Sequence, residues 1–100
     1  MTIEQQNLMD DKRIQIFKAL SDQTRLEILR LMVKNGDANH EISCTPFFET
    51  LHLSKSTISF HLKTLREAGL TFRREEGRQT FVRLNLETFK IYLPGFLESL

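Results

Sequence analysis

One hundred residues, 40% of them hydrophobic and 27% charged, are enough for one domain with a modest core, and we expect that domain to span residues 1–100. The single cysteine excludes an internal disulfide framework, and the lack of a long apolar run or of signal-peptide features predicts a cytoplasmic protein with no membrane partner. The net charge of +1 is uneven, because residues 54–84 carry seven basic and three acidic side chains, a net charge of +4. This local excess favours a polyanionic partner over a merely solvated face, which would usually mix the two signs.

Two helices are expected in the first third of the chain. Thr2 begins a stretch with capping-box spacing, and apolar residues then follow at helical intervals, which predicts a helix over about 3–19. Ser21 or Asp22 can cap a second helix, which should stop before Gly36. The apolar residues of this second helix occupy more than one face, so we expect it in the middle of a helical bundle.

A pair of helices follows, separated by a short turn. Thr45 supplies a hydroxyl able to cap a helix and Pro46 suits the first helical position, which predicts a short helix ending near Leu51. Ser54 then caps the next helix, and Gly69 ends it as a residue able to adopt a positive φ. The second helix of the pair is therefore predicted over residues 54–68.

The remaining residues change period twice. Apolar residues alternate with polar ones over 70–84, with a charged turn in between, which predicts a β-hairpin. Helical spacing returns from Leu86, but Pro94 disfavours helical geometry in the residue before it, so a kink or two short pieces are expected. The order of four helices, a hairpin and a final helix predicts a mainly α fold of the winged helix-turn-helix type.

The helix over residues 54–68 carries an unusual outer face. Ile58, Leu62 and Leu65 form a narrow apolar stripe, and the opposite side shows small hydroxyls, a lysine and an aromatic ring. Short hydroxyl side chains let the backbone approach DNA, a helix N-terminus attracts phosphate, and an aromatic ring can lie against a thymine methyl group. We therefore expect this helix to enter the major groove of double-stranded DNA. The candidate DNA-binding residues, with the hairpin arginines, are Ser54, Lys55, Ser56, Thr57, Ser59, Phe60, His61, Lys63, Arg73, Arg74 and Arg78.

Structural roles compete with DNA contact at several of these positions. Phe60 can instead pack against a neighbouring helix, and His61 borders the apolar stripe, where a hydrogen-bonded structural histidine is equally plausible. The Ser54 hydroxyl is structural in part, whatever else it contacts. The hairpin arginines can lie along the DNA backbone or in the minor groove, or can simply be solvated.

Three stretches resemble the ArsR/SmtB family of bacterial winged-helix repressors. "FKALSDQTRLEILRLM" resembles the family's ALSDPTRLxIL segment, "LHLSKSTISFHLKTLREAGL" resembles its LGLSxxTVSxHLxxLxxAGL, and "REEGRQTFVRLN" fits its wing. The resemblance covers Phe17 to Leu86 and implies a homodimeric repressor, joined by its first and last helices, that often responds to a metal ion or a redox signal. Two recognition helices related by a two-fold axis would suit a pseudo-palindromic operator.

The first and last helices also carry more apolar surface than a small domain can cover, which independently favours a dimer. The candidate interface residues are Ile3, Leu8, Met9, Ile14, Phe89, Leu93, Phe96, Leu97 and Leu100.

This chain departs from the family pattern chiefly at the residues that bind metal ions in the family's metal-sensing members. Where the family's metal-sensing version has two cysteines, this chain has Ser43 and Thr45, with Cys44 between them. The last helix contains no histidine for the family's second metal site, so we predict no metal and no cofactor, and the effector stays unknown. A redox role for Cys44 is disfavoured, because the chain has no second cysteine to resolve it. His52 stands where the family usually has glycine, a position that can require a positive φ.

Two other classes of function remain as alternatives. A winged-helix module can bind protein instead of nucleic acid, and salt-dependent binding to a duplex would separate these two possibilities. An enzyme is disfavoured, because no Ser/His/Asp constellation, phosphate loop or carboxylate pair stands out, and no catalytic residue is predicted.

Overall fold

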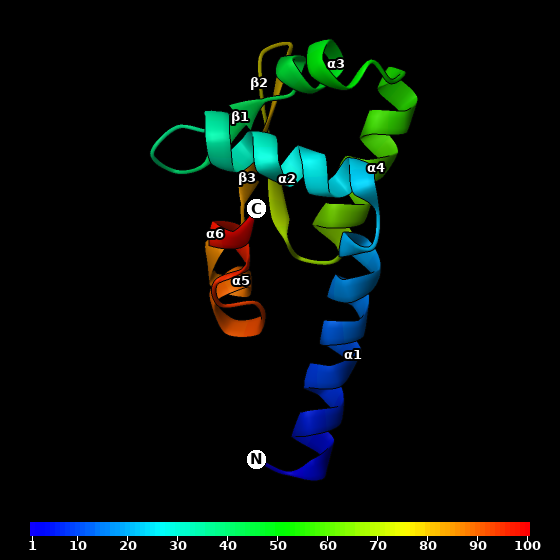
Figure 1. Cartoon of the computed structure of the whole chain (residues 1–100), viewed down its shortest axis with the longest axis vertical. Coiled ribbons are helices and arrows are strands. Elements are labelled where there is room, and N and C mark those ends of the chain that lie inside the picture. Colours follow the sequence, from blue (N-terminus) through cyan, green and yellow to red (C-terminus); the bar gives the residue numbers. More distant parts are fainter.

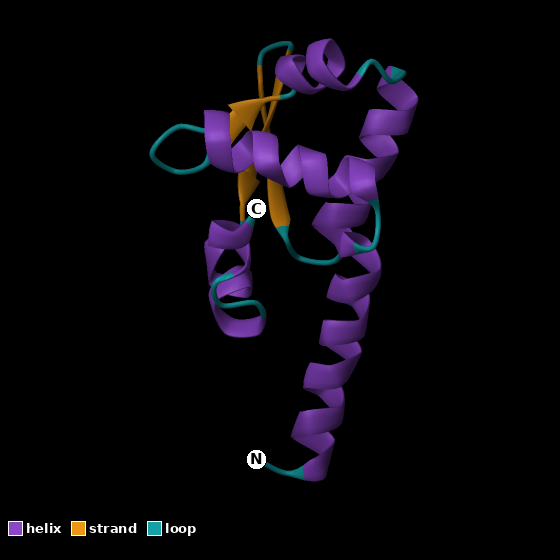
Figure 2. Cartoon of the chain, in the orientation of Figure 1, coloured by secondary structure: helices purple, strands orange, loops and turns teal.

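The computed structural model describes all residues from Met1 to Leu100 as a group of helices packed against a small three-stranded sheet, whose hairpin turn lies exposed (Figures 1 and 2). The elements follow in the order α1 (Ile3–Leu20), α2 (Gln23–Asn35), β1 (Glu41–Ser43), α3 (Thr45–Leu51), α4 (Lys55–Glu67), β2 (Thr71–Glu76), β3 (Gln79–Leu84), α5 (Leu86–Tyr92) and α6 (Phe96–Ser99). None of the helices combines the length and the apolar character needed to cross a membrane.

Helix α1 is capped as its sequence predicts. The Thr2 hydroxyl accepts a hydrogen bond from the Gln5 backbone N–H, and the Gln5 side chain accepts one from the Thr2 backbone, at 3.1 and 2.8 Å. Only the last part of the helix is buried, through Ile16, Ala19 and Leu20. The first half of α1 therefore projects away from the rest of the molecule (Figure 1).

Helix α2 lies in the middle of the structure, as expected from its apolar residues. Asp22, rather than Ser21, is its N-cap, and the Asp22 carboxylate accepts a hydrogen bond from the Arg25 backbone N–H at 3.1 Å. The side chains of Ile28 and Met32 are completely buried, and the helix packs against α1, α3, α4, α6 and β1.

The sheet contains a strand that the sequence analysis did not predict. Strand β1 pairs antiparallel with β3, with Ile42 opposite Val82, and the strand order is β1-β3-β2. Three residues are too few to show an alternating pattern, so pairing with β3 decides this conformation. The start of α3 also differs from its prediction, because Cys44 is the N-cap and no side chain caps the helix. Pro46 does lie in the first turn, but the proposed capping role of Thr45 is wrong.

The β-hairpin and the broken C-terminal helix are confirmed. Strands β2 and β3 pair antiparallel from Thr71↔Leu84 to Glu76↔Gln79, and Gly77 adopts a positive φ of 61° in the turn. Helix α5 ends before Pro94, and Gly95, with a φ of 83°, precedes the single turn of α6. The Phe89 and Phe96 rings stack across this break, with 6.2 Å between their centroids.

His52 adopts a left-handed backbone conformation, which is consistent with the glycine that the family usually has at this position. It ends α3 with a φ of 54°, where an L-residue with a Cβ atom is strained. The chain needs this conformation in order to turn sharply from α3 into α4.

We predict that His52→Gly stabilises the protein by about 0.5–1 kcal/mol, since the left-handed strain it removes exceeds the extra chain entropy of glycine. Glu49→Gly, at an exposed position inside the same helix, should instead destabilise it by about 0.5–1 kcal/mol. Urea unfolding of the two variants beside the parent measures both effects. Equal destabilisation by both glycines would contradict the assigned strain.

Candidate nucleic-acid interface

Helix α4 buries one side and exposes the other, as its sequence predicts. Ile58 and Leu65 are completely buried and Leu62 nearly so. On the opposite side the Phe60 side chain is 62% exposed, which excludes the alternative that it packs against a neighbouring helix. The exposed face therefore presents an aromatic ring among short hydroxyls and a lysine.

The first turn of α4 is organised by hydroxyl groups. The Ser54 hydroxyl accepts a hydrogen bond from the Thr57 backbone N–H at 3.2 Å and donates one to the Thr57 hydroxyl at 2.8 Å. The Ser54 and Thr57 hydroxyls thus form the cap, and the Ser56 hydroxyl lies 3.2 Å from that of Ser54, whereas Ser56 and Ser59 are both exposed to solvent. The Lys55 and Ser56 backbone N–H groups have no acceptor within the helix and are free to meet a phosphate. The Lys55 ammonium group lies 5.7 Å from the centre of the Phe48 ring.

His61 holds two helices together instead of facing outward. Its side chain is only 12% exposed, and its Nδ1 lies 3.0 Å from the Arg25 guanidinium and 3.9 Å from the Asp22 carboxylate. Arg25 also donates a hydrogen bond to the Ala19 carbonyl oxygen at the end of α1, so its guanidinium links the start of α2 to both α1 and α4. The burial and the partners of His61 favour its structural role over the predicted contact with DNA.

The Arg74 side chain is neutralised within the wing, which is the hairpin formed by β2 and β3. Its guanidinium contacts the Glu41 and Glu76 carboxylates, each at 2.6 Å, and lies over the Phe81 ring at 4.5 Å. The hydrogen bond from Arg74 lowers the pKa of Glu41, and those to Glu41 and Glu76 raise the pKa of Arg74. Arg74 thereby ties the wing to β1, and its charge is the least available to DNA among the three predicted hairpin arginines.

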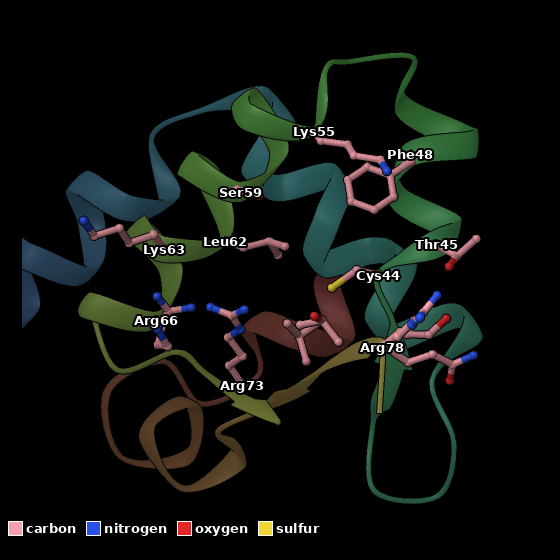
Figure 3. Close-up of a pocket in the computed structure, with 14 residues that line it drawn as sticks. Cys44, Thr45, Phe48, Lys55, Ser59, Leu62, Lys63, Arg66, Arg73 and Arg78 are labelled. Atoms are coloured by element: carbon pink, nitrogen blue, oxygen red, sulfur yellow. The ribbon is translucent and has the colours of Figure 1, made fainter. Parts of the chain in front are cut away.

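The other two hairpin arginines are more available. Arg73 contacts only Glu75, and Arg78 lies exposed in the turn with no carboxylate within 4.0 Å. Both line a cavity of about 620 Å³ between α3, α4 and the wing (Figure 3). The cavity is also lined by Arg66, which the sequence analysis did not select although it lies about two helical turns beyond Ser59 on the same side of α4. The predicted DNA-binding residues that meet here are Lys55, Ser59, Lys63, Arg73 and Arg78.

The predicted dimer residues divide between surface and core. Ile3, Leu8 and Ile14 expose 79%, 70% and 51% of their surface, whereas Met9 is half-buried. Phe89 is only 3% exposed and belongs to the core of its own chain, so its selection as an interface residue is corrected. The other predicted interface residues near the C-terminus are half-buried and pack against that core: Leu93, Phe96, Leu97 and Leu100.

Three exposed apolar residues were missed on α1 and on α5. Phe17 on α1 exposes 53% of its surface, and Leu86 and Ile91 on α5 expose 45% and 55%. Phe17 was not selected as an interface residue, and only the last part of its helix meets the core, through Ile16, Ala19 and Leu20. Helices α1 and α5 extend toward the same end of the molecule, away from α3 (Figure 1).

No three His, Cys, Asp or Glu side chains come together in a group that could hold a metal ion. Cys44 is 6% exposed, and burial raises the pKa of its thiol against a weaker opposite effect of Arg73. A protonated, buried thiol is a poor metal ligand and a poor nucleophile.

Two helices joined by a tight turn, followed by a β-hairpin that shares a basic cavity with the second helix, define a winged helix-turn-helix. Residues 22–70 match the family model described as "Bacterial regulatory protein, arsR family". The chain is 49% identical over its whole length to the uncharacterized HTH-type transcriptional regulator YceK of Bacillus subtilis, covering 95% of that protein. It is 40% identical over 72 residues to the arsenical resistance operon repressor of Escherichia coli, which covers 72% of this chain and 58% of the repressor.

A solved structure shows the same fold. Reduced HlyU from Vibrio cholerae superposes with a TM-score of 0.72 at 28% identity, over 96% of this chain and 92% of that one. The chain belongs to the arsR family of bacterial regulatory proteins. The predictions of family, of winged-helix fold and of a DNA-binding transcriptional regulator rather than an enzyme are thereby confirmed.

The Asp22 carboxylate gives the α2–α4 link a pH dependence. Burial alone would raise its pKa, but the Arg25 backbone N–H and the charges of Arg25 and His61 together lower it below the ordinary 3.8. A carboxyl group with a lowered native pKa stabilises the fold above its unfolded pKa, and this contribution is lost as the pH falls through the native pKa.

We predict that Asp22→Asn, which keeps a good N-cap residue but removes the charge, destabilises the protein at pH 7. The difference in unfolding free energy from the parent should shrink as the pH is lowered below about 4, because the parent then loses the same charge. Urea unfolding of the variant and the parent at pH 7, 5 and 3.5 measures this difference in unfolding free energy. A difference that stays constant with pH would contradict this reading.

Proposed function

We propose that the protein is a homodimeric repressor that binds a pseudo-palindromic operator with α4 in the major groove and the wing on the backbone or in the minor groove. The observation that carries the proposal is the outer face of α4, where Ser56, Ser59 and an exposed Phe60 lie beside unpaired cations. The name of the Escherichia coli relative, a repressor, supports repression as the mode of action. A regulator of this kind acts in the cytoplasm, where the bacterial chromosome lies.

The interface divides by chemistry into two groups. Short hydroxyls and the Phe60 ring suit base edges and thymine methyl groups, which distinguish one sequence from another. Lys63 and Arg78 are exposed, and an exposed cation suits phosphates, which are the same in every sequence. Lys63 has one weak partner, Glu67 at 3.7 Å, which a phosphate can replace.

We predict that Ser56→Ala, Ser59→Ala or Phe60→Ala weakens operator binding by about 1–3 kcal/mol while leaving random DNA almost unaffected. Lys63→Gln and Arg78→Gln should weaken both kinds of DNA and reduce the salt slope by about one unit. Fluorescence anisotropy measures these effects, with an operator selected from a random pool. Lys90→Gln, which removes an exposed charge on α5, is the matched control and should change nothing.

Binding by all three alanine variants like the parent would refute this use of α4. Duplex binding that is absent, or insensitive to salt, would instead favour the alternative of a module that binds protein.

The dimer proposal rests on exposed apolar side chains. Leu8, Ile14 and Phe17 on α1, and Ile91 on α5, each expose at least half of their surface. Exposed apolar side chains on two helices that reach the same end of the molecule favour an interface there, and a two-fold axis would bury both helices of each chain together. The same axis would present two α4 helices to successive major grooves.

We predict that the parent sediments as a dimer at tens of micromolar and that Phe17→Glu shifts it to a monomer, because a buried, unpaired carboxylate is costly at an apolar interface. Phe72→Glu places the same change on an exposed aromatic residue of the wing and should leave the dimer intact. Equilibrium sedimentation decides between the two states, and a monomeric parent would contradict the proposal.

A further prediction concerns the effector. A soft metal ion or arsenite would find only the buried Cys44 thiol, and a lone sulfur cannot complete a shell of three or four ligands. One equivalent of zinc, cadmium or arsenite should therefore leave the anisotropy of the DNA complex unchanged. Release of DNA by one equivalent of any of these ions would contradict the prediction that the protein has no site for them.

A further inference from the structure

The cavity between α3, α4 and the wing combines a basic rim with an apolar floor (Figure 3). Its volume of about 620 Å³ falls within the range of pockets that enclose small organic ligands. Cys44, Phe48, Leu62 and Val82 supply the apolar lining. The floor is uncharged, because burial raises the pKa of the Cys44 thiol and keeps it protonated near neutral pH.

Five cations line this cavity and no carboxylate does. Lys63 and Arg73 each have one exposed carboxylate partner outside the lining, Glu67 and Glu75, which a ligand oxyanion can replace. Arg73 reaches from β2 toward Arg66 of α4, so two guanidinium groups approach the same side of the cavity (Figure 3).

Arg66 and Arg78 have no carboxylate within 4.0 Å. Lys55 has no carboxylate partner either, and its ammonium group lies over the Phe48 ring. Like charges that converge beside an apolar surface repel one another more strongly than in open water. An oxyanion between them would relieve that repulsion and accept charge-assisted hydrogen bonds.

We propose that this cavity binds a small organic oxyanion, a carboxylate or phosphate monoester on a flat apolar body, and that its occupancy excludes DNA. The charged group would lie between Arg66 and Arg73, and the apolar body would lie against Leu62 and Val82. The second half of the proposal rests on the proposed function, because five residues of the cavity are also predicted DNA contacts. One set of cations cannot hold a small anion and a DNA phosphate at the same time, so the two ligands compete.

The site is tested first without DNA. Phenyl phosphate and benzoate are titrated at constant ionic strength into the uniformly ¹⁵N-labelled protein, and amide resonances are followed. Saturable shifts at Ser59, Leu62 and Val82 are expected for both probes. Inorganic phosphate should bind at least about tenfold more weakly, because it lacks the apolar body. Benzyl alcohol and benzylamine, which lack the negative charge, should cause no saturable shift.

The proposal is overturned if inorganic phosphate binds as well as phenyl phosphate, if benzylamine binds as tightly as phenyl phosphate, or if no probe saturates these resonances at millimolar concentration.

A pair of variants separates a defined site from general charge attraction. Arg66→Gln should weaken phenyl phosphate binding by about ten- to a hundredfold, the usual effect of losing a charge-assisted hydrogen bond. Lys90→Gln makes the same change of charge on α5, outside the cavity, and should leave the affinity unchanged. The same spectra report whether each variant is folded. Equal affinities for both variants would refute the assignment.

Competition with DNA is measured by anisotropy of the labelled operator. At a phenyl phosphate concentration ten times its dissociation constant, the apparent dissociation constant of DNA should rise about elevenfold. An unchanged DNA affinity at a saturated cavity would overturn the exclusion of DNA. If no duplex binds at all, the proposed function fails, while the amide shifts still decide whether the cavity binds the anion.

Discussion

The burial of one side of α4 fixes the direction in which its other side faces. Ile58 and Leu65 are fully enclosed, and the helix packs against α1, α2, α3 and β2. Each buried aliphatic side chain stabilises the fold by roughly 1.5–3 kcal/mol, and a turn of the helix by one residue, about 100°, would expose them. The core therefore determines that Phe60 and its neighbouring hydroxyls face outward, and their own contacts, such as the edge-on approach of the Phe60 and His61 rings at 5.6 Å, lie within α4 and its cap. The link from His61 through Arg25 to the start of α2 strengthens the same orientation.

Some basic residues of α4 and the wing are paired with carboxylates and others are not, a difference that the net charge of the segment does not reveal. Arg74 is committed to Glu41 and Glu76 and holds the wing against β1. Arg66 and Arg78 have no carboxylate partner and turn toward the cavity or the solvent. The unpaired cations thus gather where α4 and the wing face each other. If a small anion and DNA both use them, each weakens the binding of the other by the same factor, since the coupling is reciprocal.

Much of the fold follows from local sequence signals that act within a few residues. The capping box at Thr2, the apolar stripe of α4 and the break at Pro94 each predicted what the structure contains. The errors occur where tertiary contacts decide. Strand β1 is too short to show a period and forms because β3 pairs with it. Cys44 takes the capping position expected of Thr45, since the Cys44 backbone N–H bonds to the Thr80 carbonyl oxygen and fixes where α3 begins.

In the DNA-binding site and the dimer surface, too, features set by local sequence could be predicted and features set by tertiary contacts could not. The exposed face of α4 could be predicted, because a helix with a fixed period and one apolar stripe leaves only one face for solvent. The roles of His61 and Phe89 could not, because each depends on a partner distant in sequence or on the packing of the whole core. Arg66 could have been found, since its spacing from Ser59 places it on the face already selected.

Hydroxyl-radical footprinting of the selected operator tests the central claim most directly, that two α4 helices related by a two-fold axis read double-stranded DNA. The account predicts two symmetric protected segments whose centres lie about 10–10.5 base pairs apart, or a multiple of that spacing, as expected for successive major grooves. Lys63→Gln should weaken both segments equally. A single asymmetric protected segment, or no protection at protein concentrations that saturate anisotropy, would contradict it.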